Sequence, residues 1–177
     1  MRKTIPTLML LAGLWLLLYP VFSQQRNAAL QHRAVAAWEA TEGDTDILGY
    51  LNIPKLSLTL PIRQGTSDAT LQSGIGLLEG TDFDAHAVLC GHSGLPEAKL
   101  FTDLHQLQPG DRFAVTLRDR VRSYEVVQVI VAEPEEVHHL QPEEGTELCT
   151  LLTCTPYGIN SHRLLIRGAL LDISLFG

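Results

Sequence analysis

The segment TLLTCTPYGINSHRLLIRG, residues 150–168, is the most informative part of this chain. It begins as a short β-rich run that ends at Cys154, and a second apolar run begins at Arg163. A proline, a glycine and an asparagine lie close together between them, which predicts two consecutive strands joined by a tight turn. A thiol and a guanidinium at the mouths of neighbouring strands indicate a nucleophile facing an anion-stabilising group. A buried cysteine beside a solvated arginine is the structural alternative.

Length, charge and cysteine content limit the classes of function. The 177 residues suit one ordinary domain with an extension. A net charge of -7, with 13 scattered lysines and arginines, argues against a nucleic-acid partner, which would require a basic face. Three cysteines, Cys90, Cys149 and Cys154, cannot all pair within one chain. Because there is no CxxC and no zinc-type spacing, the sequence predicts neither a metal nor another cofactor.

Residues 1–23 are predicted to form a signal anchor that crosses the membrane once. Arg2 and Lys3 precede a Leu-rich uncharged run whose apolar centre covers residues 5–22, long enough for a membrane span. The two cations predict a cytoplasmic N-terminus and an extracellular domain. A cleaved signal peptide is the alternative, because Ser23 ends a tolerable cleavage site. Both interpretations predict a domain that works outside the cytoplasm.

Residues 24–46 form a polar, Ala-rich segment whose composition favours a helix. Trp38 offers an apolar contact by which this juxtamembrane helix could dock on the following domain, and a projecting stalk is the alternative. Residues 42–44, Glu-Gly-Asp, predict the end of the helix.

From residue 47 to residue 177 the chain consists of short β-like runs separated by turns, which predicts a barrel or a sandwich. Pro61 lies inside the second run and indicates an edge strand. The expected strands cover residues 47–53, 58–63, 74–80, 86–91, 112–117, 121–133, 147–153 and 163–173. The expected helical turns cover residues 67–72, 98–105 and 134–140.

A cysteine nucleophile requires a proton donor, and the chain contains seven histidines. His92 differs from the others because it directly follows an apolar strand and precedes a loop. If this strand neighbours the Cys154 strand in the same direction, the imidazole and the thiol share one rim of the sheet. His86 begins the same strand and is expected to be a core or edge residue.

Three segments of the chain carry a family resemblance. Residues 151–163, LLTCTPYGINSHR, resemble the sortase signature, in which Leu-x-Thr-Cys is followed nine residues later by Arg. The form TPYGxNxxR is similar to that of the pilus-assembling class C branch. Residues 86–104, HAVLCGHSGLPEAKLFTDL, resemble the histidine segment of the same class, and residues 49–56 resemble its opening strand. The resemblance extends over residues 47–171.

The resemblance implies a mainly β fold, an eight-stranded sortase barrel with short helices, behind an N-terminal membrane helix. It implies an exported cysteine transpeptidase of Gram-positive bacteria that needs no cofactor and cleaves an LPxTG-like sorting signal between Thr and Gly. The implied roles are nucleophile for Cys154, proton donor and acceptor for His92, and oxyanion or substrate contact for Arg163. The residues implied in substrate binding are Thr153, Tyr157, Asn160 and Leu95.

Several functional alternatives remain open at this stage. The implied partners are pilins or surface proteins with a C-terminal sorting signal, and the acceptor amine is either a pilin lysine in pilus assembly or a cell-wall precursor in anchoring. A secreted cysteine peptidase that hydrolyses its acyl-enzyme and a non-catalytic scaffold are further alternatives. Two departures from class C concern regulation: no Asp-Pro-aromatic lid motif precedes Pro54, and Ser93 stands where the family often has Arg.

The remaining cysteines are expected to be reduced core residues. Cys149 lies five positions before Cys154, so on a regular strand their side chains face opposite ways. If the strand of Cys90 and the strand of Cys149 end at one level, the two residues are offset by about three positions, roughly 10 Å. Such an offset exceeds the reach of a disulfide.

Overall fold

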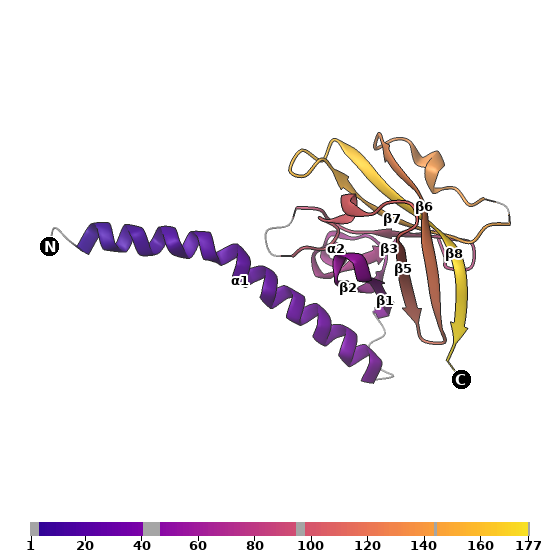
Figure 1. The fold of residues 1–177 in the computed structure, drawn as a ribbon, viewed down its shortest axis with the longest axis horizontal. Coiled ribbons are helices and arrows are strands. Elements are labelled where there is room, and N and C mark those ends of the chain that lie inside the picture. The colour runs from indigo at the N-terminus through magenta and orange to yellow at the C-terminus, as the bar shows by residue number, and fades with distance from the viewer. Residues whose placement is uncertain (1–3, 41–46, 95–97, 144, 177) are drawn as a thin grey trace.

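The computed structural model of the 177-residue chain describes residues 4–40, 47–94, 98–143 and 145–176. A long N-terminal helix leads into a closed barrel of eight strands (Figure 1). The strand order around the barrel is β1-β2-β3-β4-β7-β8-β6-β5. The mainly β, eight-stranded architecture with few short helices confirms the fold expected from the sequence.

The elements follow the predicted runs closely. The strands are β1 (Ile47–Ile53), β2 (Leu58–Gln64), β3 (Ile75–Leu77), β4 (His86–Cys90), β5 (Arg112–Leu117), β6 (Arg120–Ala132), β7 (Leu148–Thr155) and β8 (His162–Leu175). The α-helices are α1 (Thr4–Ala40) and α2 (Asp68–Ser73), and the 3-10 turns are η1 (Pro54–Leu56), η2 (Leu104–Gln106) and η3 (Val137–Leu140).

Two strand pairs in the barrel are parallel. β2 pairs with β3 and β4 pairs with β7 in parallel, whereas the other neighbours are antiparallel. Buried and half-buried residues alternate along β1 because one face of the strand points into the barrel. The parallel β4–β7 pair directs the ends of two strands, and the loops that follow them, to the same rim.

The expectation that residues 58–63 form an edge strand is wrong. β2 lies between β1 and β3 in the closed barrel. Pro61 is tolerated there because the ladder between β2 and β3 begins only at Ile62. The missing amide hydrogen of the proline is therefore not required by that ladder.

The helix expected over residues 98–105 is also not found. Among the described residues of this segment and just beyond it, only η2 is helical. Leu100 has a φ of 32°, which a right-handed helix cannot include. Phe101 and Leu104 are both fully buried, so the segment is held by core packing and not by a helical repeat.

A buried polar network closes the end of the barrel opposite Cys154. The side chain of Arg122 on β6 is 1% exposed. Its Nε donates to the hydroxyl of Tyr124 at 2.9 Å, while its terminal nitrogens reach the carboxylates of Asp84 and Glu147. Tyr124 stacks on Phe113 with ring centroids 5.2 Å apart, so the network is continuous with the apolar core.

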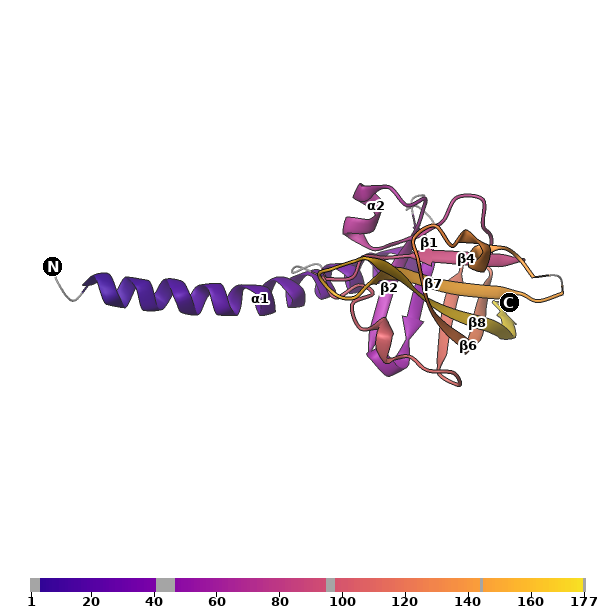
Figure 2. The same ribbon diagram turned by 90° about the horizontal axis from the view of Figure 1, so that it is seen from above.

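The C-terminal end of α1 is docked on the barrel, whereas its N-terminal part extends away to one side in two perpendicular views (Figures 1 and 2). Trp38 is buried, and its Nε1 donates to the carbonyl of Ile47 at 2.9 Å. Its ring meets Tyr50 edge to face at 5.7 Å, and the guanidinium of Arg118 lies 4.2 Å from the ring centroid. The structure therefore combines the docked helix and the projecting stalk that the sequence left as alternatives.

Among the described residues, none of the helices is both long enough and apolar enough to cross a membrane. The signal anchor at residues 1–23 stays a prediction, and the expected helix break at residues 42–44 lies outside the described residues.

Candidate active site

Cys154 lies near the end of β7 on the outer face of the barrel. Leu151 and Thr153 are buried at 0% and 2% exposure on the inner face. Because side chains alternate along a strand, Leu152 and Cys154 point outward. Cys154 is partly exposed, so a substrate that lies along the outside of the sheet can reach the thiol.

Two neighbouring strands bring partners to the level of Cys154. On β8, Arg163 is the register partner of Cys154. On β4, Cys90 is the partner of Leu152, and His92 follows Cys90 by two residues. Parallel register therefore brings His92 to the level of Cys154, and adjacent strands lie about 4.8 Å apart. Cys154 thus lies in one row between the histidine and the arginine, which we call the site row.

Three hydrogen bonds tie the chain around His92 to β7. The amide of Gly91 donates to the β7 backbone at 3.1 Å, and its carbonyl accepts a hydrogen bond from Thr153 Oγ1 at 2.7 Å. Ser93 Oγ donates to the carbonyl of Cys154 at 2.7 Å. The residues on both sides of His92 are therefore anchored to β7.

Gly91 also explains how the histidine loop passes so closely over the core. A Cβ at this position would lie 2.8 Å from the ring of Phe101 and 3.0 Å from Ile75. The amide of Phe101 in turn donates to the carbonyl of His92 at 3.0 Å. A larger residue at position 91 would therefore force either the Phe101 ring or the backbone beside His92 to shift.

The residues predicted to bind substrate lie in different environments. Tyr157 and Asn160 are exposed on the turn between β7 and β8, and the Tyr157 ring lies against Gly94, where an added Cβ would be 3.1 Å from it. Thr153 is buried, and its hydroxyl holds the histidine segment. Leu95 lies outside the described residues. Substrate contact stays a prediction for all four residues.

Arg163 is held at the start of β8 by the turn that precedes it. Its Nη1 donates to the carbonyls of Asn160 and His162 at 3.3 and 3.2 Å. Beside it lies a small cavity of about 30 Å³ between β7, β8 and the segment after β6. Its walls are largely apolar and include Ala132, Pro134, Leu140, Leu152 and Leu165, with carboxylates from Glu133 and Glu136.

Comparison with known proteins decides the family. The model of the Sortase domain matches residues 51–171, more than half of the chain. The chain belongs to the sortase family. A curated sortase relative, Sortase A of Bacillus anthracis, is 26% identical over 126 residues, which cover 70% of this chain and 60% of that protein. This chain therefore spans less than two thirds of the length of that relative.

Solved structures of sortases match over a similar part of the chain. Sortase C1 from Streptococcus agalactiae is 40% identical with a TM-score of 0.71, and the match covers 75% of this chain and 71% of that chain. Sortase C1 from Streptococcus suis is 45% identical with a TM-score of 0.70, covering 72% and 74%. These class C neighbours agree with the branch indicated by the residues around Cys154.

The other two cysteines of this sortase are buried. Cys149 pairs with Ala87, so Cys90 lies three positions beyond it, which confirms the predicted offset. All three cysteines are free thiols. Burial, together with the neighbouring Cys154, raises the pKa of Cys90 to about 11, and burial raises the pKa of Cys149 as well. Of the three, Cys154 is the exposed thiol and hence the candidate nucleophile.

His86 is a structural histidine in the core. Only 2% of it is exposed, its Nε2 lies 2.8 Å from Thr150 Oγ1 and its Nδ1 lies 3.1 Å from the carbonyl of Gln141. Burial lowers its pKa, and a hydrogen bond to Gln141 offsets part of this effect. Within the described residues, no group of three or more His, Cys, Asp or Glu side chains is arranged to hold a metal ion.

The stability of the barrel should fall with acid because of His86. Its pKa is lowered in the folded state, so the unfolded state binds the proton more readily. The contribution of neutral His86 to the free energy of unfolding is complete above the unfolded pKa of about 6.5. It is lost as the pH falls from there through the folded pKa. Urea unfolding between pH 8 and pH 5 measures this slope, which should become shallower in His86→Gln. An unchanged slope in that variant would contradict the assignment.

Sequence reasoning did not recognise Ser93 as a functional residue. The sequence showed only that serine stands where the family often has arginine. Its importance comes from the hydrogen bond to the Cys154 carbonyl, a contact across 61 positions that no local pattern reveals. A small hydroxyl residue directly after the histidine is the only signal that could have indicated it.

Ser93→Ala should lower kcat about tenfold with little change in KM, because removing a hydrogen bond that positions a catalytic group raises the barrier without touching bound substrate. Ser93→Thr keeps the hydroxyl and should restore most of the rate. Steady-state kinetics of both variants, alongside their unfolding curves, measures the effect. A similar loss in Ser93→Thr, or a drop in stability that accounts for the loss, would rule out a positioning role.

Proposed function

We propose that this protein is a cysteine transpeptidase that cleaves an LPxTG-like sorting signal and joins it to an amine. The observation that carries the proposal is the site row, in which the partly exposed Cys154 lies between His92 and Arg163. Nucleophile, proton-transfer group and cation are the three components that acyl transfer through a thioester requires. Membership of the sortase family supports the same chemistry.

In the first half-reaction, the Cys154 thiolate attacks the carbonyl carbon of the threonine in the signal. The C–N bond to glycine breaks, and His92 donates a proton to the departing amine. The product is a thioacyl bond between Cys154 and the threonine carbonyl. In the second half-reaction, an incoming amine attacks this carbonyl, His92 accepts its proton, and the sulfur leaves as thiolate.

Arg163 is proposed to stabilise the negative oxygen of each tetrahedral intermediate or the substrate backbone. Its planar guanidinium remains charged at any physiological pH and offers several donors in fixed directions. Nη1 is already oriented by two carbonyls of the preceding turn, so the remaining donors are held in a defined position. Lysine would keep the charge but would lack this fork.

The cavity beside Arg163, at about 30 Å³, is too small for a side chain of the signal. The apolar residues around it, among them Leu152 of β7, are proposed to flank the hydrophobic part of an LPxTG-like motif that lies over the outside of the sheet. Tyr157 and Asn160, exposed on the adjoining turn, are proposed to line the same groove.

We propose a pilin lysine as the acceptor amine, and therefore a role in pilus assembly. Support comes from the class C neighbours, among which is a structure described as a pilus-related sortase C of Group B Streptococcus. Anchoring of surface proteins to the cell wall is the alternative acceptor chemistry. We also propose that residues 1–23 anchor the protein in the membrane with the barrel outside, supported by the uncharged run that follows Arg2 and Lys3.

The proposal is tested by incubating the full chain with an LPxTG-containing peptide and analysing the products by mass spectrometry. A thioacyl adduct on Cys154 and an amide product that requires an added lysine peptide are expected. A cell-wall precursor amine accepted in place of the lysine peptide would favour anchoring. Exclusive hydrolysis, with no amide product in the presence of either amine, would refute the transpeptidase and leave a cysteine peptidase.

A further inference from the structure

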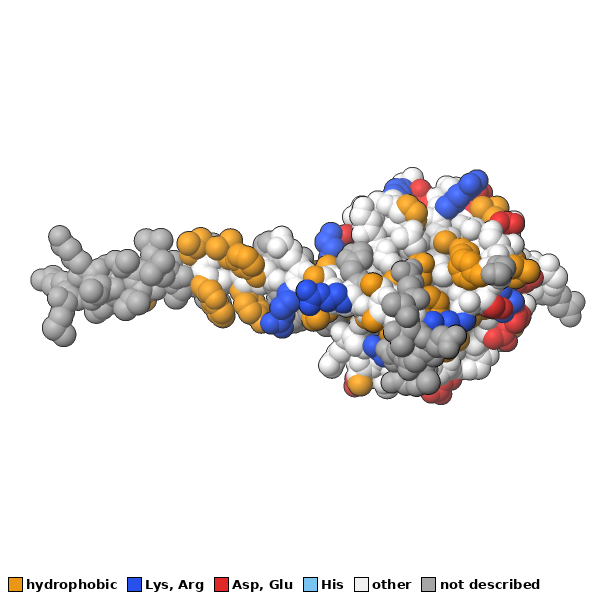
Figure 3. Space-filling view, turned by 90° about the horizontal axis from the view of Figure 1, so that it is seen from below, with side chains coloured by type: hydrophobic (Ala, Val, Ile, Leu, Met, Phe, Trp, Pro, Cys, Tyr) orange, Lys and Arg blue, Asp and Glu red, His pale blue; other side chains and the backbone are white. Residues whose placement is uncertain are grey.

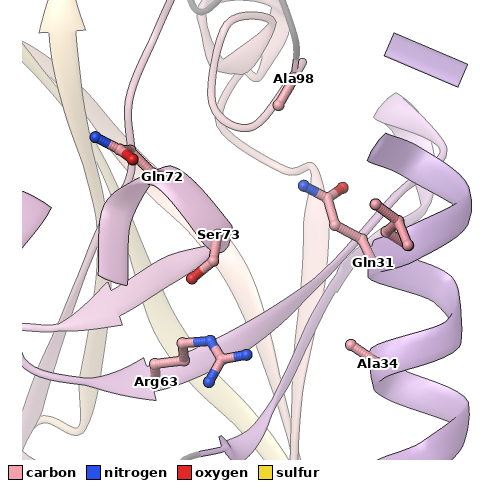
Figure 4. Close-up of a pocket in the computed structure, with 7 residues that line it drawn as sticks. Gln31, Ala34, Arg63, Gln72, Ser73 and Ala98 are labelled. Carbon is pink, nitrogen blue, oxygen red and sulfur yellow. The ribbon is translucent and has the colours of Figure 1, made fainter. Parts of the chain in front are cut away.

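A cavity lies between the N-terminal helix and the barrel, away from the site row. Its volume is about 250 Å³. Leu30, Gln31 and Ala34 of α1 line one side, Arg63 of β2 lies below, and Gln72 and Ser73 of α2 lie on the other side. The side chains of Gln31 and Arg63 point into the space between α1 and the barrel, whereas the Gln72 amide points away from α1 (Figure 4). Ala98, which follows the histidine loop in the chain, completes the lining. The cavity therefore joins the helix, the barrel and the segment that leads away from His92.

Arg63 brings an uncompensated positive group into this cavity. Its guanidinium extends toward α1 (Figure 4), and its Nε is buried with no hydrogen-bond partner among the described residues. Arg120 and Arg167 also bury an unpartnered Nε, but each reaches a carboxylate through another nitrogen, at 3.0 and 2.6 Å. No such ion pair with a described carboxylate is found for Arg63. A buried donor of this kind calls for an acceptor.

The other polar groups of the cavity suit an anion. The side-chain amide of Gln31 points into the same space as the Arg63 guanidinium and carries two donor hydrogens, and none of the described lining residues is acidic. Ser73 contributes less, because its hydroxyl already donates to backbone carbonyls within α2. One charged and one neutral donor group thus share one space.

The surrounding surface is also electropositive, in a chain whose net charge is -7. From residue 4 to residue 38 the sequence contains no aspartate or glutamate, and the exposed side chains of Arg26 and Arg33 lie on α1. Figure 3 shows Lys and Arg side chains gathered where α1 meets the barrel. This local field attracts anions toward the mouth of the cavity.

We propose that this cavity binds a phosphate group, with the Arg63 guanidinium as its principal contact. A planar guanidinium pairs with two phosphate oxygens at once, and the Gln31 amide can bind a third. The volume exceeds that of inorganic phosphate, so the phosphate of a phospholipid headgroup is accommodated as well. Because α1 and the barrel both contribute donors, the bound group fastens the helix to the barrel. This inference does not depend on the proposed reaction.

The test uses the full chain in a maltoside micelle, which carries no phosphate. Inorganic phosphate is titrated by calorimetry against chloride at the same ionic strength, while the Arg63 Nε–H resonance is followed by NMR. We expect saturable binding that shifts this resonance and weakens about tenfold or more in Arg63→Gln. Arg112→Gln, which changes an arginine side chain that is 71% exposed, is the matched control and should bind as the wild type does.

Two further experiments identify the source of the phosphate and test whether a carboxylate of the chain occupies the cavity instead. A shift caused by short-chain phosphatidylglycerol but not by inorganic phosphate assigns the site to a lipid headgroup, whereas the reverse assigns it to free phosphate. Glu97 adjoins Ala98 in the sequence and lies outside the described residues, so Glu97→Gln tests whether a carboxylate of the chain fills the cavity. Binding seen only in Glu97→Gln, or no Arg63 shift with either ligand, overturns the proposal.

Discussion

Cys154→Ala should abolish formation of the thioacyl adduct and reduce the rate of signal cleavage at least about a thousandfold, the scale of loss on removing a catalytic nucleophile. The side chain projects outward from the end of β7, so its removal disturbs no core packing and the fold should persist. Mass spectrometry of the enzyme mixed with an LPxTG-containing peptide measures the adduct directly.

Alkylation of the native protein provides the matched control. Iodoacetamide should add one group to the wild type and none to Cys154→Ala, because Cys90 and Cys149 are buried and their pKa values are raised. Cys149→Ala should retain both the single alkylation and the adduct. A thioacyl adduct that persists without Cys154, or a second thiol alkylated as fast in the native wild type, would contradict the assignment of the nucleophile.

Arg122→Ala should lower the free energy of unfolding by about 2–4 kcal/mol, because it leaves the buried Tyr124 hydroxyl without its partner and opens a cavity in the barrel end. The side chain is 1% exposed and bonds to the tyrosine at 2.9 Å. Urea titration of the full chain gives the value.

Arg112→Ala, at an exposed arginine, is the matched control variant for this measurement. Its side chain is 71% exposed and pairs with Glu125 at 3.4 Å, so the change should stay within about 1 kcal/mol. Arg122→Met fills the space without the hydrogen bonds and should fall between the two. If Arg122→Ala proves no more destabilising than Arg112→Ala, the buried network does not hold the barrel end together.

Most strand positions of the barrel could be predicted because turn-forming residues mark the strand ends and apolar and polar residues alternate between them. Residues 47–53 were predicted as a strand and form β1, where a proline directly follows the alternating run. The prediction of a helix over residues 98–105 was wrong because the spacing of Phe101 and Leu104 resembles a helical repeat. In the structure both side chains are buried because they contact the barrel interior. The prediction of an edge strand from Pro61 was wrong because the sequence does not show where the hydrogen-bond ladder with the neighbouring strand begins.

The candidate residues of the site could be selected from residue types, whereas the contacts that hold them in place could not. Cys154, His92 and Arg163 are recognisable because each lies at the end or start of an apolar run within a known signature. Ser93 and Gly91 hold the chain around His92 through hydrogen bonds between a side-chain hydroxyl and a backbone carbonyl, which link it to a strand about sixty positions away. Such contacts depend on the parallel register of β4 and β7, which appears only once the barrel is closed.

The parallel pairing of β4 and β7 also bears on when the enzyme becomes reactive. Arg163 is only nine positions from Cys154 and can meet it when the last hairpin forms, but His92 is 62 positions distant. A contact over that distance carries a larger loop-closure entropy than the hairpin and is expected to form later. A partly folded chain therefore holds its thiol beside Arg163 but without His92, and the site row is complete only in the finished tertiary structure.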